Sequence, residues 1–393
     1  MLLSIALIIL VGLAAGEAVK RLQMPAIIGY LIAGFLIGPF CLNWLDTGML
    51  GISAEVRRIA LVIILMKAGL SLVLADLRRI GRPAVLLCFV PATCEIIAFM
   101  LFAPRLLGLS LLESALLGAV MGAVSPAVVV PRMSRMMDEG WGTRKGIPQM
   151  IVAGASADDV YVIVIFTALL SLTSDGSVSA WDFAQIPIAM LSGIAAGAAA
   201  GLLMVFILSR IRMNTIQQFI VLLSAGFLLL ALEEALKPFF SLSGLLAVMS
   251  MCITFRFRRR EMAGANAAVC GKTWIGAEIF LFVLVGAIVD VRYIGQAGFT
   301  MLAMLIIGLG FRLAGTWFSV SGKGLTRREH IFCSFSEIPK ATVQAAIGGM
   351  PLAAGLACGN TVLSFSVLAI LITAPIGAIL IDSTYRKWLT KDR

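Results

Sequence analysis

The chain has 393 residues, of which 60% are hydrophobic and only 13% are charged, and its formal net charge is +10. Its mean hydropathy is +1.03. Soluble domains carry about a quarter charged residues. The composition therefore excludes a soluble globular enzyme, a disordered chain and a nucleic-acid-binding protein. The 7 cysteines form no CxxC motif and lie mostly in apolar runs, which indicates buried small hydrophobic residues rather than a metal site.

A membrane-spanning helix needs about 20 predominantly apolar residues. By this criterion the sequence predicts an all-α polytopic membrane protein with about thirteen transmembrane helices. In chain order these are residues 2–19, 24–42, 56–75, 84–106, 111–133, 147–173, 182–209, 216–236, 240–255, 273–290, 296–318, 330–352 and 355–382. No basic segment precedes the first apolar run, so we expect a span there rather than a cleaved signal.

The distribution of Lys and Arg over the loops predicts the orientation. With thirteen spans, one side of the membrane holds 23 of the 31 basic residues, the other side holds 5, and 3 lie within spans. Because basic loops stay in the cytoplasm, we expect the N-terminus outside and the C-terminus inside. This asymmetry also explains the positive net charge without a nucleic-acid partner.

Two short internal matches indicate a repeat. Residues 64–70 (ILMKAGL) resemble 283–288 (VLVGAI), and residues 125–128 (SPAV) resemble 338–341 (IPKA). The copies lie about 215 residues apart, a distance of seven spans. An odd number of spans inverts the second copy, so spans 1–6 and 8–13 are expected to be inverted repeats joined by span 7. That arrangement is typical of secondary transporters with a site near the membrane midplane.

Five ionisable residues fall near the middle of predicted spans, where a charge costs about 2.5–3.5 kcal/mol on insertion scales. They are Glu95, Asp158, Asp159, Arg312 and Lys340. Such groups are usually functional or paired for structural reasons. These five residues are therefore the candidates for the functional site.

Asp158 and Asp159 are adjacent on one predicted helix and point about 100° apart, so we expect them to have different partners. Two close carboxylates in a low-dielectric site cannot both ionise easily. One of them should then hold either a proton or a small cation, which is the competition that an exchanger requires. The alternative is a pair that is simply neutralised by neighbouring cations.

Lys340 follows Pro339 and needs a counter-ion at its depth. Asp158 or Asp159 is the natural partner, and Glu337 is a competitor. The alternative interpretation is a fixed structural salt bridge.

Glu95 and Arg312 are each alone in an apolar span, so they can satisfy one another. We interpret them first as a structural pair, because breaking a buried pair strands a charge. Gating or a proton relay is the alternative.

Pro126 and Pro131 bracket an apolar run in span 5. Proline removes a backbone donor and frees a carbonyl one turn earlier, and freed groups at membrane depth are tolerated where they line a cavity. The run therefore indicates an interrupted helix, with a plain proline kink as the alternative.

Three stretches together resemble the NHA-type sodium/proton antiporters of the monovalent cation:proton antiporter superfamily. They are residues 125–131 (SPAVVVP), 155–159 (ASADD) and 338–346 (IPKATVQAA). Residues 29–34 (GYLIAG) and 67–70 (KAGL) fit the same picture. The double-Asp and KATVQAA motifs are the specific ones, and the resemblance extends over roughly residues 20–350.

The resemblance implies two inverted repeats of six helices joined by a linker helix, with two broken helices that cross at mid-membrane and contain Pro126, Pro131 and Pro339. It also implies a scaffold that forms a homodimer and a mobile ion-transport core. The implied division is scaffold 1–77 and 214–293, core 81–173 and 296–385, and linker 182–210.

The resemblance assigns roles to single residues. Asp159 would carry the cation or proton, Asp158 would pair with Lys340, and Glu95 would pair with Arg312. The expected oxygen ligands of the cation are Asp159, Asp158, Ser125 and Ser156. Two departures from the family pattern are Ala157, where many relatives have an aromatic residue, and Glu337, which adds an acid beside Lys340.

The sequence thus predicts a multi-pass antiporter of the plasma membrane, not an enzyme, that exchanges Na⁺ or Li⁺ for H⁺ by elevator-like alternating access and needs no cofactor. The alternatives are a K⁺/H⁺ antiporter and a sodium-coupled symporter of an organic anion on the same fold. Its expected partners are monovalent cations, protons, the lipid bilayer and a second copy of the chain, and no nucleic acid.

Overall fold

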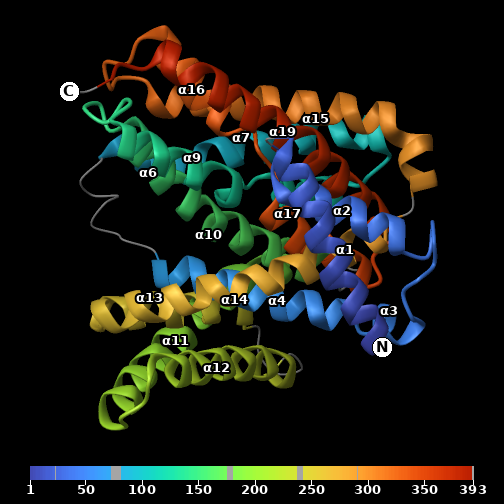
Figure 1. Cartoon of the computed structure of the whole chain (residues 1–393), viewed down its shortest axis with the longest axis vertical. Coiled ribbons are helices and arrows are strands. Elements are labelled where there is room, and N and C mark those ends of the chain that lie inside the picture. The colour runs from blue at the N-terminus through green and yellow to red at the C-terminus, as the bar shows by residue number, and fades with distance from the viewer. Residues whose placement is uncertain (23, 72–80, 175–179, 237–241, 290, 392–393) are drawn as a thin grey trace. The chain divides into compact units, whose positions relative to one another are not determined.

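The computed structural model describes the backbone of residues 1–22, 24–71, 81–174, 180–236, 242–289 and 291–391. Within these ranges the side chains of residues 156–157, 174, 180–187 and 291–297 are not described. The elements of the described chain are helices (Figure 1). Helices satisfy their own backbone groups, which a chain in lipid requires because the bilayer core offers no water as a partner.

Nine helical segments of the described chain are long and apolar enough to cross a membrane. They are Leu2–Arg21, Arg82–Leu107, Leu111–Glu139, Ile147–Thr173, Ile188–Arg210, Thr215–Leu236, Arg260–Ala287, Gly298–Val320 and Gly359–Trp388. Helix α2 (Ala26–Ile37) is apolar but shorter. The prediction of an all-α polytopic membrane protein is therefore confirmed.

The chain divides into two compact units, which we describe separately. Unit 1 comprises Met1–Ala54, Val73–Val162 and Leu281–Arg393, and unit 2 comprises Glu55–Leu72 and Ile163–Phe280.

Unit 2 contains parts of six helices, whose full bounds are α4 (Ser53–Ser71), α10 (Ile147–Ser174), α11 (Ala180–Arg210), α12 (Thr215–Leu236), α13 (Gly244–Arg258) and α14 (Arg260–Ala287). A row of glycines on α11 packs directly on α13. A Cβ added at Gly193 or Gly201 would meet the backbone carbonyl of Ser243 or Met251, in each case at 2.6 Å. Small residues allow helix backbones to approach closely in a membrane. This glycine row therefore packs two helices of the same chain.

Unit 1 holds the predicted site residues. Its helices are α1 (Leu2–Arg21), α2, α3 (Thr47–Gly51), α6 (Arg82–Leu87), α7 (Val90–Leu107), α8 (Leu111–Met121), α9 (Pro126–Glu139), the first part of α10 (Ile147–Ser174), the end of α14, α15 (Val291–Val320), α16 (Arg327–Ser336), α17 (Thr342–Ile347), α18 (Met350–Ala353) and α19 (Gly359–Trp388).

Two of the predicted spans are interrupted helices. The first breaks between α8 and α9 at residues 122–125, and the second breaks between α16 and α17 at residues 337–341. Pro126 is the first residue of α9, and Pro339 lies inside the second break. The two breaks are in direct contact, because the Ser125 N–H donates to the Pro339 carbonyl at 2.8 Å. Pro131 lies within the continuous helix α9 and so does not mark a break.

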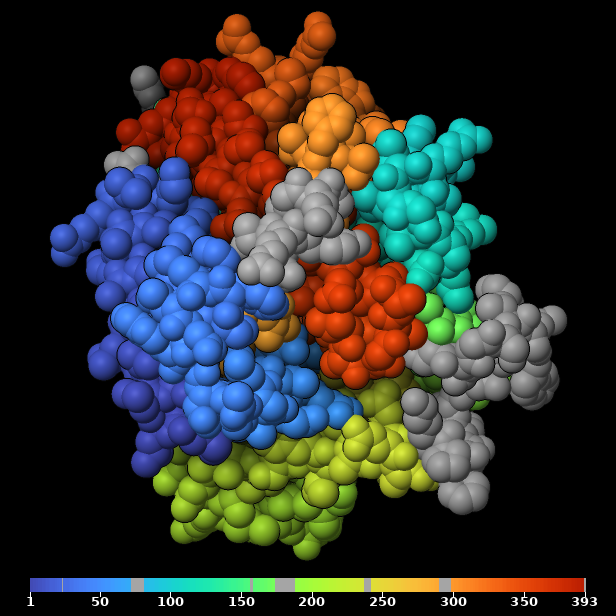
Figure 2. Space-filling view, turned by 90° about the vertical axis from the view of Figure 1, so that its right-hand side faces the viewer, coloured from blue at the N-terminus to red at the C-terminus, as the bar shows by residue number. Residues whose placement is uncertain are grey.

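The second broken span reaches the surface of unit 1 at its far end. Figure 2 shows the chain around α18, in orange-red, on the face turned to the viewer. At its other end, the second broken span begins with α16, whose first turn contains a capping box. The Thr326 side chain accepts a hydrogen bond from the Glu329 N–H, and the Glu329 side chain accepts one from the Thr326 N–H.

Glu329 also accepts a hydrogen bond from Lys145 Nζ at 2.7 Å. Burial acts to raise the pKa of Glu329, but the hydrogen bonds from Lys145 and Thr326 outweigh it and lower the pKa below its usual value. An ionised carboxylate therefore anchors the start of α16 to the chain segment before α10.

Close packing of α15 on α7 places the buried charges opposite one another. Gly308 and Gly315 lie on the same face of α15 as Arg312, at helical spacings of four and three residues. A Cβ at Gly308 would meet the Phe99 ring at 2.7 Å, and a Cβ at Gly315 would meet Cys94 Sγ at 3.0 Å. Because Gly308 and Gly315 have no side chains, α15 approaches α7 closely enough for Arg312 to reach Glu95. Glu95 lies on α7 between Cys94 and Phe99.

We therefore expect Gly308→Leu to lower the stability of the purified protein by about 1–3 kcal/mol, the usual cost of overpacking. The measurement is thermal unfolding in detergent. Gly310→Ala is the matched control on the same helix, because a Cβ there meets nothing within 4 Å. Equal melting temperatures for the two variants would contradict the proposed role of this contact.

Candidate functional site

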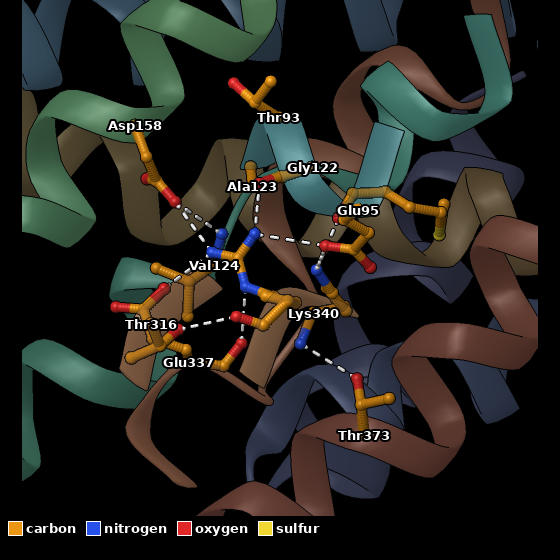
Figure 3. A network of polar contacts seen from close by, with 12 residues as sticks. Thr93, Glu95, Gly122, Ala123, Val124, Asp158, Thr316, Glu337, Lys340 and Thr373 are labelled. Atoms are coloured by element: carbon orange, nitrogen blue, oxygen red, sulfur yellow. Dashed lines mark hydrogen bonds and ion pairs between the residues drawn. The ribbon is translucent and has the colours of Figure 1, made fainter. Parts of the chain in front are cut away.

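Arg312 is the centre of a buried polar network. Figure 3 shows the network, with the partners Glu95, Asp158 and Glu337 labelled. A guanidinium has five N–H donors, and each of them has an acceptor here. Nε donates to the Glu337 carbonyl at 2.8 Å, and Nη1 donates to the Gly122 carbonyl and to Glu95 Oε2 at 3.1 Å. Nη2 donates to Glu337 Oε2 at 2.7 Å and to Asp158 Oδ2 at 3.0 Å. One side chain thus joins α7, α10, α15 and both helix breaks.

Lys340 lies in the second break and is fully buried. Its Nζ donates to Glu95 Oε2 at 2.6 Å and to the Met121 carbonyl, and its backbone N–H donates to Thr373 Oγ1 at 2.9 Å. Glu95 Oε2 therefore accepts from both cations of the network.

The predicted Asp158–Lys340 pair is replaced by a different pairing. Asp158 Oδ2 is held by Arg312 and by the Val124 N–H at 3.0 Å, whereas Lys340 Nζ bonds to Glu95. The physical reason is that the Arg312 guanidinium bonds to three carboxylates at once, those of Glu95, Asp158 and Glu337. The Lys340 ammonium bonds to Glu95, which it shares with Arg312. The predicted Glu95–Arg312 contact is present.

Asp159 differs from its neighbour. Its side chain is 5% exposed, and its Oδ1 atom has no hydrogen-bond partner in the described part of the chain. The two adjacent aspartates thus have different surroundings, as expected for side chains that point about 100° apart on a helix. Both keep a buried Oδ1 without a partner in the described chain, but Asp158 is fixed through Oδ2 by two donors, and no donor to Asp159 is found among the described residues.

The charges of the described network are unequal. Its carboxylates are Glu95, Asp158, Asp159 and Glu337, and its cations are Arg312 and Lys340, all at most 5% exposed. If every acid were ionised, the formal charge would be −2. A buried site of low dielectric strongly disfavours such an excess, so bound protons or a bound cation must reduce it.

The other predicted site residues lie as follows. Ser125 precedes α9, is fully buried, and its Oγ has no partner among the described residues. Ser156 lies on α10, but its side chain is outside the described part of the structure. Glu337, expected as a competitor for Lys340, bonds to Arg312 instead.

Sequence reasoning missed two side chains, those of Gln344 and Thr373, and several backbone groups of the network. Gln344 Nε2 donates to the carbonyls of Val120 and Ala123 at 3.1 and 3.0 Å. The Val124 N–H and the carbonyls of Met121 and Gly122 also belong to the network. The available signal for Gln344 was its place in the KATVQAA motif, four residues after Lys340, where a helix would put both on one side.

Comparisons with known proteins agree with this architecture. Residues 5–387 match the family model described as sodium/hydrogen exchanger, transmembrane. The chain is 34% identical to sodium/hydrogen exchanger 9B2 of Mus musculus over 91% of its own length and 67% of the relative. For the Homo sapiens 9B2 protein, the identity is 32% over 91% and 68% of the two chains.

A solved structure shares the fold. It is the sodium proton antiporter MjNhaP1 from Methanocaldococcus jannaschii at pH 8, with a TM-score of 0.84 and 19% sequence identity. The match covers 98% of this chain and 97% of that one.

The shared carboxylate of Glu95 leads to a prediction about stability. Glu95→Gln keeps the shape but leaves Arg312 and Lys340 with a neutral acceptor, so we expect a loss of about 3–5 kcal/mol. Thermal unfolding in detergent measures this loss. Glu234→Gln is the control, because Glu234 pairs with Arg58 while 64% exposed, and exposed pairs contribute up to about 1 kcal/mol. A Glu95→Gln protein as stable as this control would show that the pairing does not hold the network together.

Proposed function

Because the chain belongs to the transmembrane sodium/hydrogen exchanger family, we propose that it exchanges Na⁺ or Li⁺ for H⁺, with Asp159 binding either ion in turn. Cation/proton antiport is supported by the family model, the relatives and the shared fold together. Such proteins are transporters rather than enzymes, and the ions are their cargo, so no cofactor is needed.

One observation carries the choice of Asp159. Each aspartate has a buried Oδ1 without a partner among the described residues, but Asp158 Oδ2 already accepts from Arg312 and Val124. For Asp159, in contrast, no hydrogen bond or ion pair is found among the described residues. A buried carboxylate oxygen without a donor is costly. A proton or a small hard cation relieves that cost, and oxygen ligands suit such cations. Asp158, Ser125 and Ser156 are the further oxygen ligands that we propose beside it.

Competition at Asp159 would couple the two fluxes. A carboxylate that binds a proton loses its charge and most of its affinity for a cation, so each turnover carries one or the other. Each ion shifts the populations of the inward- and outward-facing states only through its different affinities for them. We propose that the core moves against the scaffold and exposes Asp159 to the two sides alternately.

The proposed topology follows the sequence. It has thirteen spans in two inverted repeats, with the N-terminus outside and the C-terminus inside. The proposed scaffold is 1–77 and 214–293, the core is 81–173 and 296–385, and the linker helix is 182–210. The broken helices α8/α9 and α16/α17 would then be corresponding elements of the two repeats. We further propose a homodimer in the plasma membrane.

Asp159→Asn should abolish cation-driven proton movement, because an amide neither takes up the exchanged proton nor presents a charge to the cation. The measurement uses proteoliposomes with a trapped pH dye, to which Na⁺, Li⁺ or K⁺ is added outside. Repeating it with valinomycin and K⁺ to clamp the voltage shows whether the cycle moves net charge.

Asp382→Asn is the matched control, since Asp382 forms ion pairs with Arg132 and Arg135 at the end of α19 and should leave exchange intact. Full exchange by Asp159→Asn would refute the assignment. If no cation drives proton movement in the unmodified protein, the sodium-coupled anion symporter becomes the better hypothesis.

A further inference from the structure

The first half of the broken span, α8, ends inside the protein at Met121. The last four carbonyls of a helix have no intrahelical donor, and at membrane depth water does not replace it. At this end, the Ala119 carbonyl accepts from the Gly122 N–H, and four further carbonyls follow: those of Val120 and Met121 in the last turn of α8 and those of Gly122 and Ala123 in the break. Each of these four accepts a hydrogen bond from a side chain elsewhere in unit 1.

The donors are of two kinds. Lys340 and Arg312 cap Met121 and Gly122, and both are charged and are also bonded to carboxylates. Gln344, on α17, caps Val120 and Ala123 with the two hydrogens of one amide nitrogen. It is fully buried, and its own Oε1 has no partner in the described chain. Gln344 is therefore the neutral member of the cap.

Without these donors, the same carbonyls would be good ligands for a cation. Rings of backbone carbonyls replace the hydration shell of K⁺ in channels, and their number and dipole strength contribute to selectivity. A carbonyl also does not titrate near neutral pH, so cation binding by carbonyls is not opposed by protons.

The capped carbonyls lie close to the ion site along the chain. Val124 follows Ala123, and its N–H holds Asp158, the neighbour of Asp159. Ser125, with its free Oγ, comes next. The capped carbonyls, the Val124 N–H that holds Asp158 and the proposed ligand Ser125 thus occupy one six-residue stretch, residues 120–125.

We propose that Gln344 determines cation selectivity by withholding the Val120 and Ala123 carbonyls from the transported ion. The inference rests on the proposed function, since it assumes that the cation binds at Asp159. With the carbonyls capped, the site offers few oxygens, most of them from carboxylates, and so favours a small cation that competes with protons. With the carbonyls free, additional oxygens would favour a larger cation such as K⁺.

The test is Gln344→Met, which keeps the volume of the side chain and removes both donors. Thermal stabilisation of the purified protein by Na⁺ and by K⁺, against a choline baseline, gives an apparent Kd for each ion. We expect the ratio of Kd for K⁺ to Kd for Na⁺ to fall about fivefold, the size of one net hydrogen bond. Gln149→Met is the matched control, because Gln149 lies on α10 and does not bond to these carbonyls.

Gln344→Asn is the second variant, because its shorter side chain cannot reach both carbonyls, and it decides the test if Gln344→Met gives no melting transition. A ratio that falls in the Gln344 variants and stays constant in Gln149→Met supports the proposal. A constant ratio, or an equal loss of both affinities, overturns it and leaves Gln344 a packing role. The proteoliposome assay of the unmodified protein is independent of this readout, so failure of exchange and failure of selectivity are distinguishable.

Discussion

The burial of the Arg312 guanidinium is the constraint on which the rest of unit 1 depends. A permanently charged group without access to water needs an acceptor for each of its five N–H donors, and the protein supplies them from α7, α10 and both helix breaks. No single helix could provide that set. The network therefore joins separate elements, and the close contact of α15 with α7 through Gly308 and Gly315 makes it geometrically possible.

The same constraint separates the roles of the two aspartates. Arg312 forms ion pairs with Glu95, Asp158 and Glu337, so the excess negative charge of the network is left at Asp159, for which no ion pair is found among the described residues. The described network contains four buried acids and two buried cations, so the remaining negative charge has to be neutralised by a bound ion. Such a site is suited to exchanging a proton for a cation. The broken helices contribute backbone carbonyls beside this network. The side chains that donate hydrogen bonds to these carbonyls limit which of them an ion can reach.

Much of this site was predictable. The cost of a charge in lipid identified Glu95, Asp158, Asp159, Arg312 and Lys340 from a single sequence, and the structure joins all of them except Asp159 by ion pairs. Proline positions indicated the two breaks, although Pro131 lies within α9. The partners were less predictable. Lys340 was expected at Asp158 but bonds to Glu95, and Glu337, which was considered only as a competitor for Lys340, bonds to Arg312.

Local composition and helical rise along the chain were sufficient to predict the all-helical membrane architecture and to select the charges that fall inside apolar helices. Only the tertiary structure decided which acid meets which base and which backbone carbonyls remain available. Those choices depend on the approach of helices from distant parts of the chain and on the reach of individual side chains. Gln344 illustrates the difference: its position in a motif was visible, but its two acceptors lie more than 200 residues away on α8 and in the adjoining break.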